Sequence, residues 1–394
     1  MEAYVLEWLQ AIFRFAHVVT AIAWIGASFY FVWLDMNLEP ASQDLAAKGG
    51  DGELWAVHGG GFYNPQKYLV APPTMPKKLH WFYIEAYSTW LTGFGLFAIT
   101  YLYQAQVYLV DPSLMNLTGV QAGALAIGFM IAGLIAYEGI IKLCGERDRA
   151  VGLSLGVFVC GLSYLSCHVF SGRGAFVIVG ASMATMMTTN VLFWIIPGQR
   201  KVVAALKKGN EVDPLYGRRG KQRSVHNTYF VLPVLFCMLS NHFAPMASHP
   251  SNWLVLILMM LAAVLVRLFF VSRHTEKTQW WLLMAAVMVV LGVFLWLKPP
   301  PKVAAATLAP VTDGEVRAVI EKRCYGCHAL EPKLMPGLTP KGVAFESMDD
   351  INKHARSIYL QTVELKIMPL GNITKITHKE RDLLARWYKQ EHGG

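Results

Sequence analysis

Five consecutive residues near the C-terminal end carry the clearest chemical signal in this 394-residue chain: Cys324, Tyr325, Gly326, Cys327 and His328. Two thiols at this spacing lie on one helical turn, so both can add to the two vinyl groups of a haem, and the adjacent histidine then reaches the iron. Half of a zinc site is the competing interpretation, but zinc needs four ligands and no second cysteine pair follows. The run therefore predicts a covalently attached c-type haem with His328 as an axial ligand.

The second axial ligand is expected to be a methionine, which raises the reduction potential of the iron. We favour Met368, which lies well beyond His328 and just before the last predicted helix, which begins at Thr377. Met335 is the alternative, although it follows His328 so closely that the chain cannot easily turn round the macrocycle. Residues 312–394 are therefore predicted to form a small class I cytochrome c domain, with its first and last helices crossing over the haem.

The rest of the chain is far more apolar. Apolar residues make up 54% of the sequence and charged residues only 15%, whereas a soluble protein carries about 25% charged residues. A helix needs about 20 apolar residues to cross a bilayer. Eight such runs lie at roughly 9–34, 84–104, 120–141, 150–170, 174–196, 225–243, 252–270 and 279–297. We therefore expect an all-α protein, with an eight-helix transmembrane bundle over 1–297, a Pro/Ala-rich linker over 298–311 and the cytochrome c domain.

The distribution of basic residues predicts the orientation of the bundle. The net charge of +9 does not indicate nucleic-acid binding, because the basic residues lie in connections between apolar runs. Eight of them lie between Arg200 and Arg223, and Arg267 is assigned to the seventh connection, whereas Arg173 is alone in the even-numbered connections. The positive-inside rule then places the odd connections in the cytoplasm. Both termini and the cytochrome c domain are expected in the periplasm, outside a bacterial inner membrane, which is where haem c is attached.

Three histidines in or at the ends of the predicted spans are candidates for a second haem. His17 lies in the first span, and His168 and His242 end the fourth and sixth spans, all toward the outer face. Ionisable groups inside a bilayer are costly, so each is a functional hypothesis. Two of these histidines could hold a b-type haem between neighbouring helices. The alternative is that each is a hydrogen-bonded interface histidine.

A second group of polar residues lies toward the predicted cytoplasmic ends of the spans. It consists of Asn190, Gln199, Arg223, His226 and Asn227, with His58 and His80 from the first connection. Arginine, amide and imidazole groups together supply donors and acceptors that suit a flat, polar, anionic heterocycle. Anchoring by positive charge and simple packing is the alternative. Glu138 is either a proton-path residue or a partner of Lys142.

Long segments of the chain are similar to a known family. They include HVVTAIAWIGASFYFVWLD at 17–35, DGELWAVHGGGFYNPQKYLVAP at 51–72, NVLFWIIPGQRKV at 190–202, RSVHNTYFVLPVLFCMLSNH at 223–242 and MPLGNITKITHKERDLLARW at 368–387. With the CYGCH run, they resemble the bacterial membrane-bound, cytochrome c-linked urate hydroxylases, also called membrane urate oxidases. The resemblance implies oxidation of urate to 5-hydroxyisourate by an eight-span domain. It also implies that electrons leave through the haem c tail toward a soluble cytochrome c or a terminal oxidase.

Two other functions fit parts of the pattern. One is a non-catalytic membrane subunit that passes electrons from quinol to the cytochrome c tail. The other is a solute or copper transporter with a fused cytochrome c, but transport predicts a continuous Met/His-rich path, whereas the polar residues here split into an outer and an inner group. No G-x-G-x-x-G fingerprint is present, which disfavours a Rossmann-bound flavin or NAD.

Overall fold

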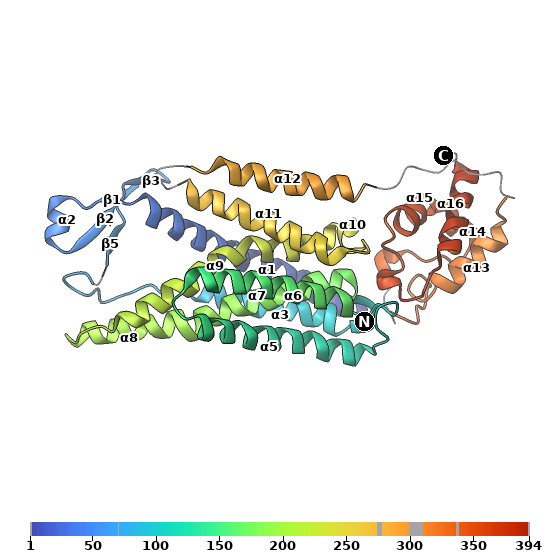
Figure 1. The fold of residues 1–394 in the computed structure, drawn as a ribbon. Coiled ribbons are helices and arrows are strands. Elements are labelled where there is room, and N and C mark those ends of the chain that lie inside the picture. The colour runs from blue at the N-terminus through green and yellow to red at the C-terminus, as the bar shows by residue number, and fades with distance from the viewer. Residues whose placement is uncertain (1, 70, 274–277, 299–309, 336–338, 393–394) are drawn as a thin grey trace.

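Helices dominate the structure, a computed structural model that describes residues 2–69, 71–273, 278–298, 310–335 and 339–392. A long helical bundle fills the middle, with a small β-region at one end and a smaller helical unit at the other (Figure 1). The bundle contains α1 (Glu2–Asn37), α3 (Ile84–Phe97), the π-helical η1 (Ala98–Leu102), α4 (Ala105–Tyr108), α5 (Gly119–Cys144), α6 (Asp148–Val169), α7 (Gly172–Thr189), the π-helical η2 (Asn190–Ile195), α8 (Ile196–Lys207), α9 (Pro214–Leu239), η3 (Ser240–His242), α10 (Ala244–Ala247), α11 (Asn252–Ser272) and α12 (Trp280–Trp296).

Each apolar run predicted from the sequence falls on one of these helices. Within the described residues, five candidate spans are long and apolar enough to cross a membrane: Tyr4–Asn37, Gly119–Cys144, Asp148–Val169, Gly172–Lys207 and Asn252–Ser272. Of the others, α12 is apolar but shorter, α3 is short before its π-helical turn, and α9 begins with a polar stretch. A mainly helical fold with membrane-capable helices is therefore confirmed, and the crossing of all eight runs stays a prediction.

The β-region shows that the expectation of an all-α chain was wrong in one connection. It holds an antiparallel sheet in the order β1 (Glu39–Pro40), β2 (Gly50–Glu53), β5 (Gln66–Tyr68), a hairpin of β3 (Ala56–His58) and β4 (Gly61–Tyr63), and the short helix α2 (Gln43–Ala47). Gly59 and Gly60 form the hairpin turn at φ values of 59° and 81°. Two-residue hairpin turns need such values, which glycine adopts without strain. The glycine-rich stretch after His58 therefore forms a turn.

The core of the bundle centres on α7, most of whose residues are buried. Helix α7 packs against α5, α6 and α9. Gly180 allows α7 and α9 to approach closely, because a Cβ there would lie 2.5 Å from the Cβ of Cys237. Small residues at such contacts are typical of helices that associate within a bilayer.

The C-terminal unit has a hydrophobic core of its own. It consists of α13 (Asp313–Arg323), η4 (Pro340–Gly342), α14 (Met348–Lys353), α15 (Ala355–Tyr359), η5 (Leu360–Glu364), η6 (Leu370–Asn372) and α16 (His378–His392). Ile320 of α13 and Trp387 of α16 are fully buried in this core. Helix α13 begins with the predicted capping box of Thr312 and Glu315. The predicted linker over 298–311 lies, apart from its ends, outside the described residues.

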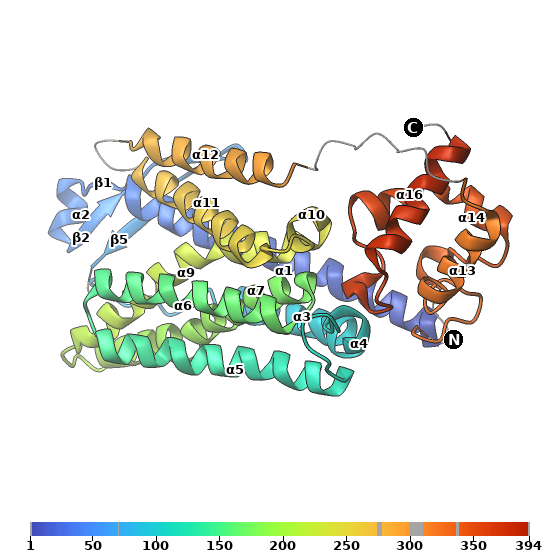
Figure 2. The ribbon, with the colours of Figure 1, turned by 45° about the vertical axis from the view of Figure 1, so that its right-hand side comes forward.

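The C-terminal unit sits on the end of the bundle where α1 begins, and the β-region and α8 lie at the opposite end (Figures 1 and 2). Within this unit, η6 packs on α4. Ser248 donates a hydrogen bond of 3.3 Å to the Leu365 carbonyl. At Gly371, a Cβ would lie 2.7 Å from the Val110 carbonyl oxygen. Both ends of the chain thus lie at one end of the bundle, as the charge distribution requires, while the side of the membrane stays a prediction.

Candidate functional site

A buried ion pair lies toward the β-region end of the bundle, between α5 and α9. Arg223 donates from its two terminal nitrogens to the two carboxylate oxygens of Glu138, at 2.6 and 2.7 Å. It also donates to Asn190 Oδ1 at 3.0 Å, and its guanidinium lies over the ring of Trp194 at 4.7 Å. Glu138 therefore neutralises Arg223, and its partner is Arg223 rather than Lys142. The charge of Arg223 is thus compensated within the protein, and its role as a substrate-binding residue stays a prediction.

Hydrogen bonds extend this pair into a chain of side chains. Asn190 donates to the hydroxyl of Tyr137 at 2.7 Å and to Oδ1 of Asn227 at 2.8 Å. Tyr137 in turn lies 2.9 Å from Nδ1 of His226. Because the Tyr137 oxygen already accepts from Asn190, its own proton is available for His226 Nδ1, which favours the tautomer with the proton on Nε2. We call Tyr137, Glu138, Asn190, Arg223, His226 and Asn227 the inner polar cluster.

A break in regular helix positions Asn190 in this cluster. Asn190 begins η2, the π-helical segment that joins α7 to α8 without a loop. Pro197, at the start of α8, has no N–H for the carbonyl four residues earlier, so the regular bonding pattern cannot continue there. Single π-helical turns are frequent at functional sites. The widened turn presents Asn190, which is fully buried, to α5 and α9.

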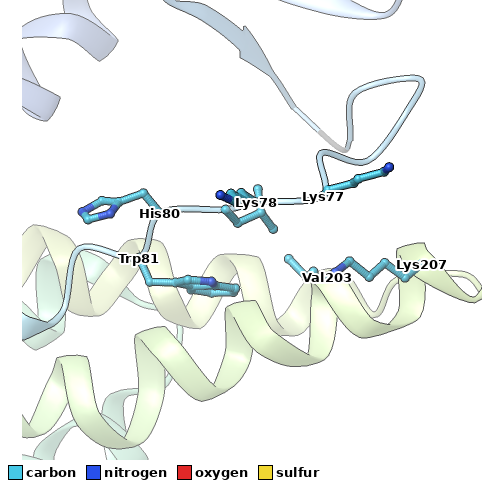
Figure 3. Close-up of a pocket in the computed structure, with 7 residues that line it drawn as sticks. Lys77, Lys78, His80, Trp81, Val203 and Lys207 are labelled. Carbon is cyan, nitrogen blue, oxygen red and sulfur yellow. The ribbon is translucent and has the colours of Figure 1, made fainter.

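The other predicted substrate residues lie apart from the inner polar cluster. Gln199 is exposed on α8, and His58 is exposed at the end of β3. His80 is also exposed, with its ring edge-on to Phe82 at 4.5 Å. Together with Trp81, it lines a pocket whose basic residues are Lys77, Lys78 and Lys207. Figure 3 shows the residues before Trp81 on an extended segment that runs over the helix carrying Lys207.

The three histidines proposed for a second haem are also separated. His17 is half-buried between α1 and α3, with Nδ1 3.1 Å from the Thr89 carbonyl. His168 is exposed and bonded to the Tyr164 carbonyl at 2.7 Å, and His242 is exposed in η3. Among the residues that the structure describes, no group of three or more His, Cys, Asp or Glu side chains is placed to hold a metal ion. The contact of His17 is made by Nδ1, so it fits both the interface and the ligand interpretation, and a membrane haem stays a prediction.

The CYGCH run fits a covalently held haem. The backbone N–H groups of Cys327 and His328 both donate to the Cys324 carbonyl, at 3.1 and 2.8 Å, so the two thiols share one turn. His328 Nδ1 lies 2.8 Å from the Val343 carbonyl, which leaves Nε2 for iron. A Cβ at Gly326 would come within 2.7 Å of a leucine side chain. Burial raises the pKa of the Cys324 thiol to about 12, and neither cysteine is in a disulfide.

The two methionine candidates for the second axial position differ in their surroundings. Met335 is 4% exposed. Met368 is half-buried, and its backbone is held at both ends, by the Gln361 carbonyl at 3.0 Å and by Arg381, which donates to the Met368 carbonyl at 3.0 Å. A fixed backbone suits an axial ligand, so Met368 remains our choice.

Two residues important for the site were missed or misplaced from the sequence. Tyr137 links Asn190 to His226, yet a tyrosine inside an apolar run gives no signal of its own. Arg267 was placed in a connection, but it lies inside α11 and is only 2% exposed. The predicted run 252–270 already contains Arg267, so the run itself could have revealed this.

Comparison with known proteins places the bundle in a family. The family model described as Urate oxidase N-terminal matches residues 3–298, three quarters of the chain. The chain belongs to this family. No curated protein and no solved structure matches it. The match covers the bundle with its inner polar cluster and indicates oxidoreductase chemistry on urate.

Proposed function

We propose that the bundle oxidises urate to 5-hydroxyisourate and passes the electrons to a c-type haem on the C-terminal unit. In this reaction urate and water give 5-hydroxyisourate, two protons and two electrons. The family match over residues 3–298 is the observation that carries the proposal. The geometry of Cys324, Cys327 and His328 supports a haem in the same chain. When bound, that haem supplies a one-electron carrier.

Urate is a monoanion at neutral pH, and the β-region end of the bundle is suited to attract it. Lys77, Lys78 and Lys207 line the surface pocket there with His80. A concentration of one charge in a concave surface raises the local concentration of an oppositely charged ligand. We therefore propose entry from this end, which the charge distribution assigns to the cytoplasm.

The inner polar cluster is proposed to take up a proton that oxidation releases. His226 is half-buried, and its contact with Tyr137 connects it to buried side chains rather than to bulk water. Glu138 and Arg223 compensate each other, so they can hold the cluster in place without adding net charge beside the substrate.

Electron exit is proposed at the opposite end of the bundle. The C-terminal unit contacts the bundle there at Leu365 and Gly371. These residues lie close to Met368 in the sequence. The hydrocarbon core is about 30 Å thick, which is too far for one efficient electron transfer. An intermediate carrier, for which His17 is a proposed ligand, therefore belongs to the scheme. The final acceptor is a soluble cytochrome c or a terminal oxidase outside a bacterial inner membrane.

The decisive experiment adds urate to the purified full-length chain under argon and follows the absorption bands of the haem. We expect urate to reduce the haem and 5-hydroxyisourate to form in proportion. Reduction by quinol but not by urate would instead assign the chain to electron transfer alone. Accumulation of unchanged labelled urate in vesicles would assign it to transport. Haem b in a pyridine haemochrome spectrum would support the intermediate carrier, and full activity with haem c alone would exclude it.

A further inference from the structure

A second buried guanidinium lies on α11, in surroundings unlike those of Arg223. Arg267 is 2% exposed, and it is covered by protein alone, so it faces the interior of the bundle rather than lipid. Its Nε and Nη2 nitrogens are buried and have no hydrogen-bond partner within the described part of the chain. The guanidinium carbon lies 4.0 Å from the centre of the Phe29 ring, on α1.

This arrangement is unfavourable without a ligand. A guanidinium keeps its proton in proteins, so Arg267 cannot become neutral. A buried charge normally has an oppositely charged partner together with hydrogen bonds. Phe29 offers only the face of its ring, which attracts a cation but accepts no conventional hydrogen bond. The N–H groups on Nε and Nη2 of Arg267 therefore have no acceptor among the described residues.

Arg267 and Arg223 differ in whether their charge has a partner. Arg223 is neutralised by two short hydrogen bonds to Glu138, whereas Arg267 keeps unpaired donors at nearly equal burial. We infer that Arg267, rather than Arg223, is the residue that recognises the urate anion. This inference rests on the proposed function and names the charge that selects its substrate.

The chemistry of urate matches these donors. Its oxygen and nitrogen atoms lie in one plane with a delocalised negative charge, and the planar guanidinium fork binds such edges by two parallel hydrogen bonds. Since Phe29 already covers one face of the guanidinium, in-plane bonding is the mode that remains open. Apolar or cationic ligands are disfavoured, because they would leave the charge of Arg267 uncompensated.

The depth of Arg267 also fits entry from the β-region end. It lies five residues before the last residue of α11, Ser272. At 1.5 Å per residue this is about 8 Å along the helix. The end of α11 where Ser272 lies faces the β-region (Figure 1). Arg267 thus lies near the β-region end of the bundle, from which entry is proposed.

The test compares full-length wild-type protein with Arg267→Gln and Arg267→Lys, and with Arg218→Gln as a control. Arg218 is on α9 but exposed, and its ion pair with Glu146 lies on the surface. Removing a charge-assisted hydrogen bond costs a factor of roughly 10 to 100 in binding. We therefore expect Arg267→Gln to raise the KM for urate by that factor, Arg267→Lys to raise it less, and Arg218→Gln to leave it unchanged.

Thermal unfolding with and without urate separates recognition from a structural role. Urate should raise the melting temperature of the wild type, because a ligand stabilises the state it binds. We expect Arg267→Gln to melt no lower than the wild type without urate and to lose the urate-dependent increase. If Arg267→Gln does not fold, Arg267→Lys keeps the charge but loses the planar fork and gives the same comparison.

Two outcomes separate the inference from the proposed function. If the wild type oxidises urate and both Arg267 variants keep its KM and its urate-dependent stabilisation, Arg267 is not the recognition residue, although the function stands. If the wild type neither binds nor oxidises urate, the proposed function is overturned and the assignment of Arg267 with it.

Discussion

The ion pair between Glu138 and Arg223 allows a quantitative test of how the bundle holds its polar groups. The side chain of Arg223 is 5% exposed and that of Glu138 is 30% exposed. Breaking a fully buried pair costs about 3–5 kcal/mol, whereas an exposed pair contributes about 0–1 kcal/mol. Because the carboxylate is partly hydrated, we expect a coupling free energy of about 2 kcal/mol.

The partial exposure of Glu138 also predicts an asymmetry between the single variants. Glu138→Gln leaves the nearly buried guanidinium of Arg223 without its counter-charge. Arg223→Gln leaves a carboxylate that water can reach, so it should destabilise the bundle less. The double variant should be more stable than the sum of the single effects predicts, by the coupling free energy.

The assay is reversible unfolding of the full chain in micelles with a rising fraction of denaturing detergent, followed by tryptophan fluorescence. The double-variant cycle of Glu146→Gln and Arg218→Gln is the matched control, because the pair of Glu146 with Arg218 is 66% and 56% exposed. Its effect should be too small to resolve. A coupling for Glu138 and Arg223 no larger than that of the control would refute the reasoning, because it would mean that the pair is fully hydrated in solution.

Three further predictions concern the C-terminal unit. Burial raises the pKa of Glu380, but hydrogen bonds from Arg323 and a nearby threonine outweigh it, so the pKa lies below its ordinary value of 4.5. The stabilisation is therefore present above pH 4.5 and lost as the pH falls through the lowered pKa. Glu380→Gln should therefore reduce the fall of the melting temperature at acidic pH. A melting temperature that falls as steeply in Glu380→Gln as in the wild type would contradict this. Gly371→Val should weaken the contact of the C-terminal unit with the Val110 carbonyl. It should slow haem reduction by urate without changing reduction by dithionite. Equal slowing of both reactions would indicate a damaged haem site instead. Cys327→Ala should leave at most one thioether and shift the pyridine haemochrome band, because one vinyl group stays unsaturated, and an unchanged band would exclude attachment at this residue.

The helices of the bundle could be predicted from the sequence, because their signal is local. The run predicted at 120–141 is α5 at Gly119–Cys144, and the others agree to a similar degree except at polar ends. The first run, predicted at 9–34, is a helix from Glu2 to Asn37. It continues in both directions because helical hydrogen bonding does not require apolar side chains.

The β-region could not be predicted, because its strands have two to four residues and largely exposed side chains. Such strands lack the alternation of buried and exposed residues that identifies a strand in a sequence. The pairing of β3 with β4 uses Gly59 and Gly60, directly after His58, for a turn.

The candidate site was predictable within α9 and not beyond it. Arg223, His226 and Asn227 lie within five residues of one helix, so their grouping follows from helical spacing. That Glu138 pairs with Arg223 rather than with Lys142 depends on which faces of α5 and α9 meet. Counting basic residues does not show how deep in the bundle each one lies, which is why Arg267 was placed in a connection.

Helix α9 connects the inner polar cluster with the proposed recognition residue. It packs on α7 and also on α11, and Tyr229 of α9 lies near Arg267 of α11. Residues three apart are neighbours on a helix surface, so Tyr229 lies beside His226 and on a different side from Asn227. On α9, His226 therefore lies between the side near Arg267 and the side that contacts Tyr137. Urate bound at Arg267 would therefore lie on the Tyr229 side of α9, next to His226.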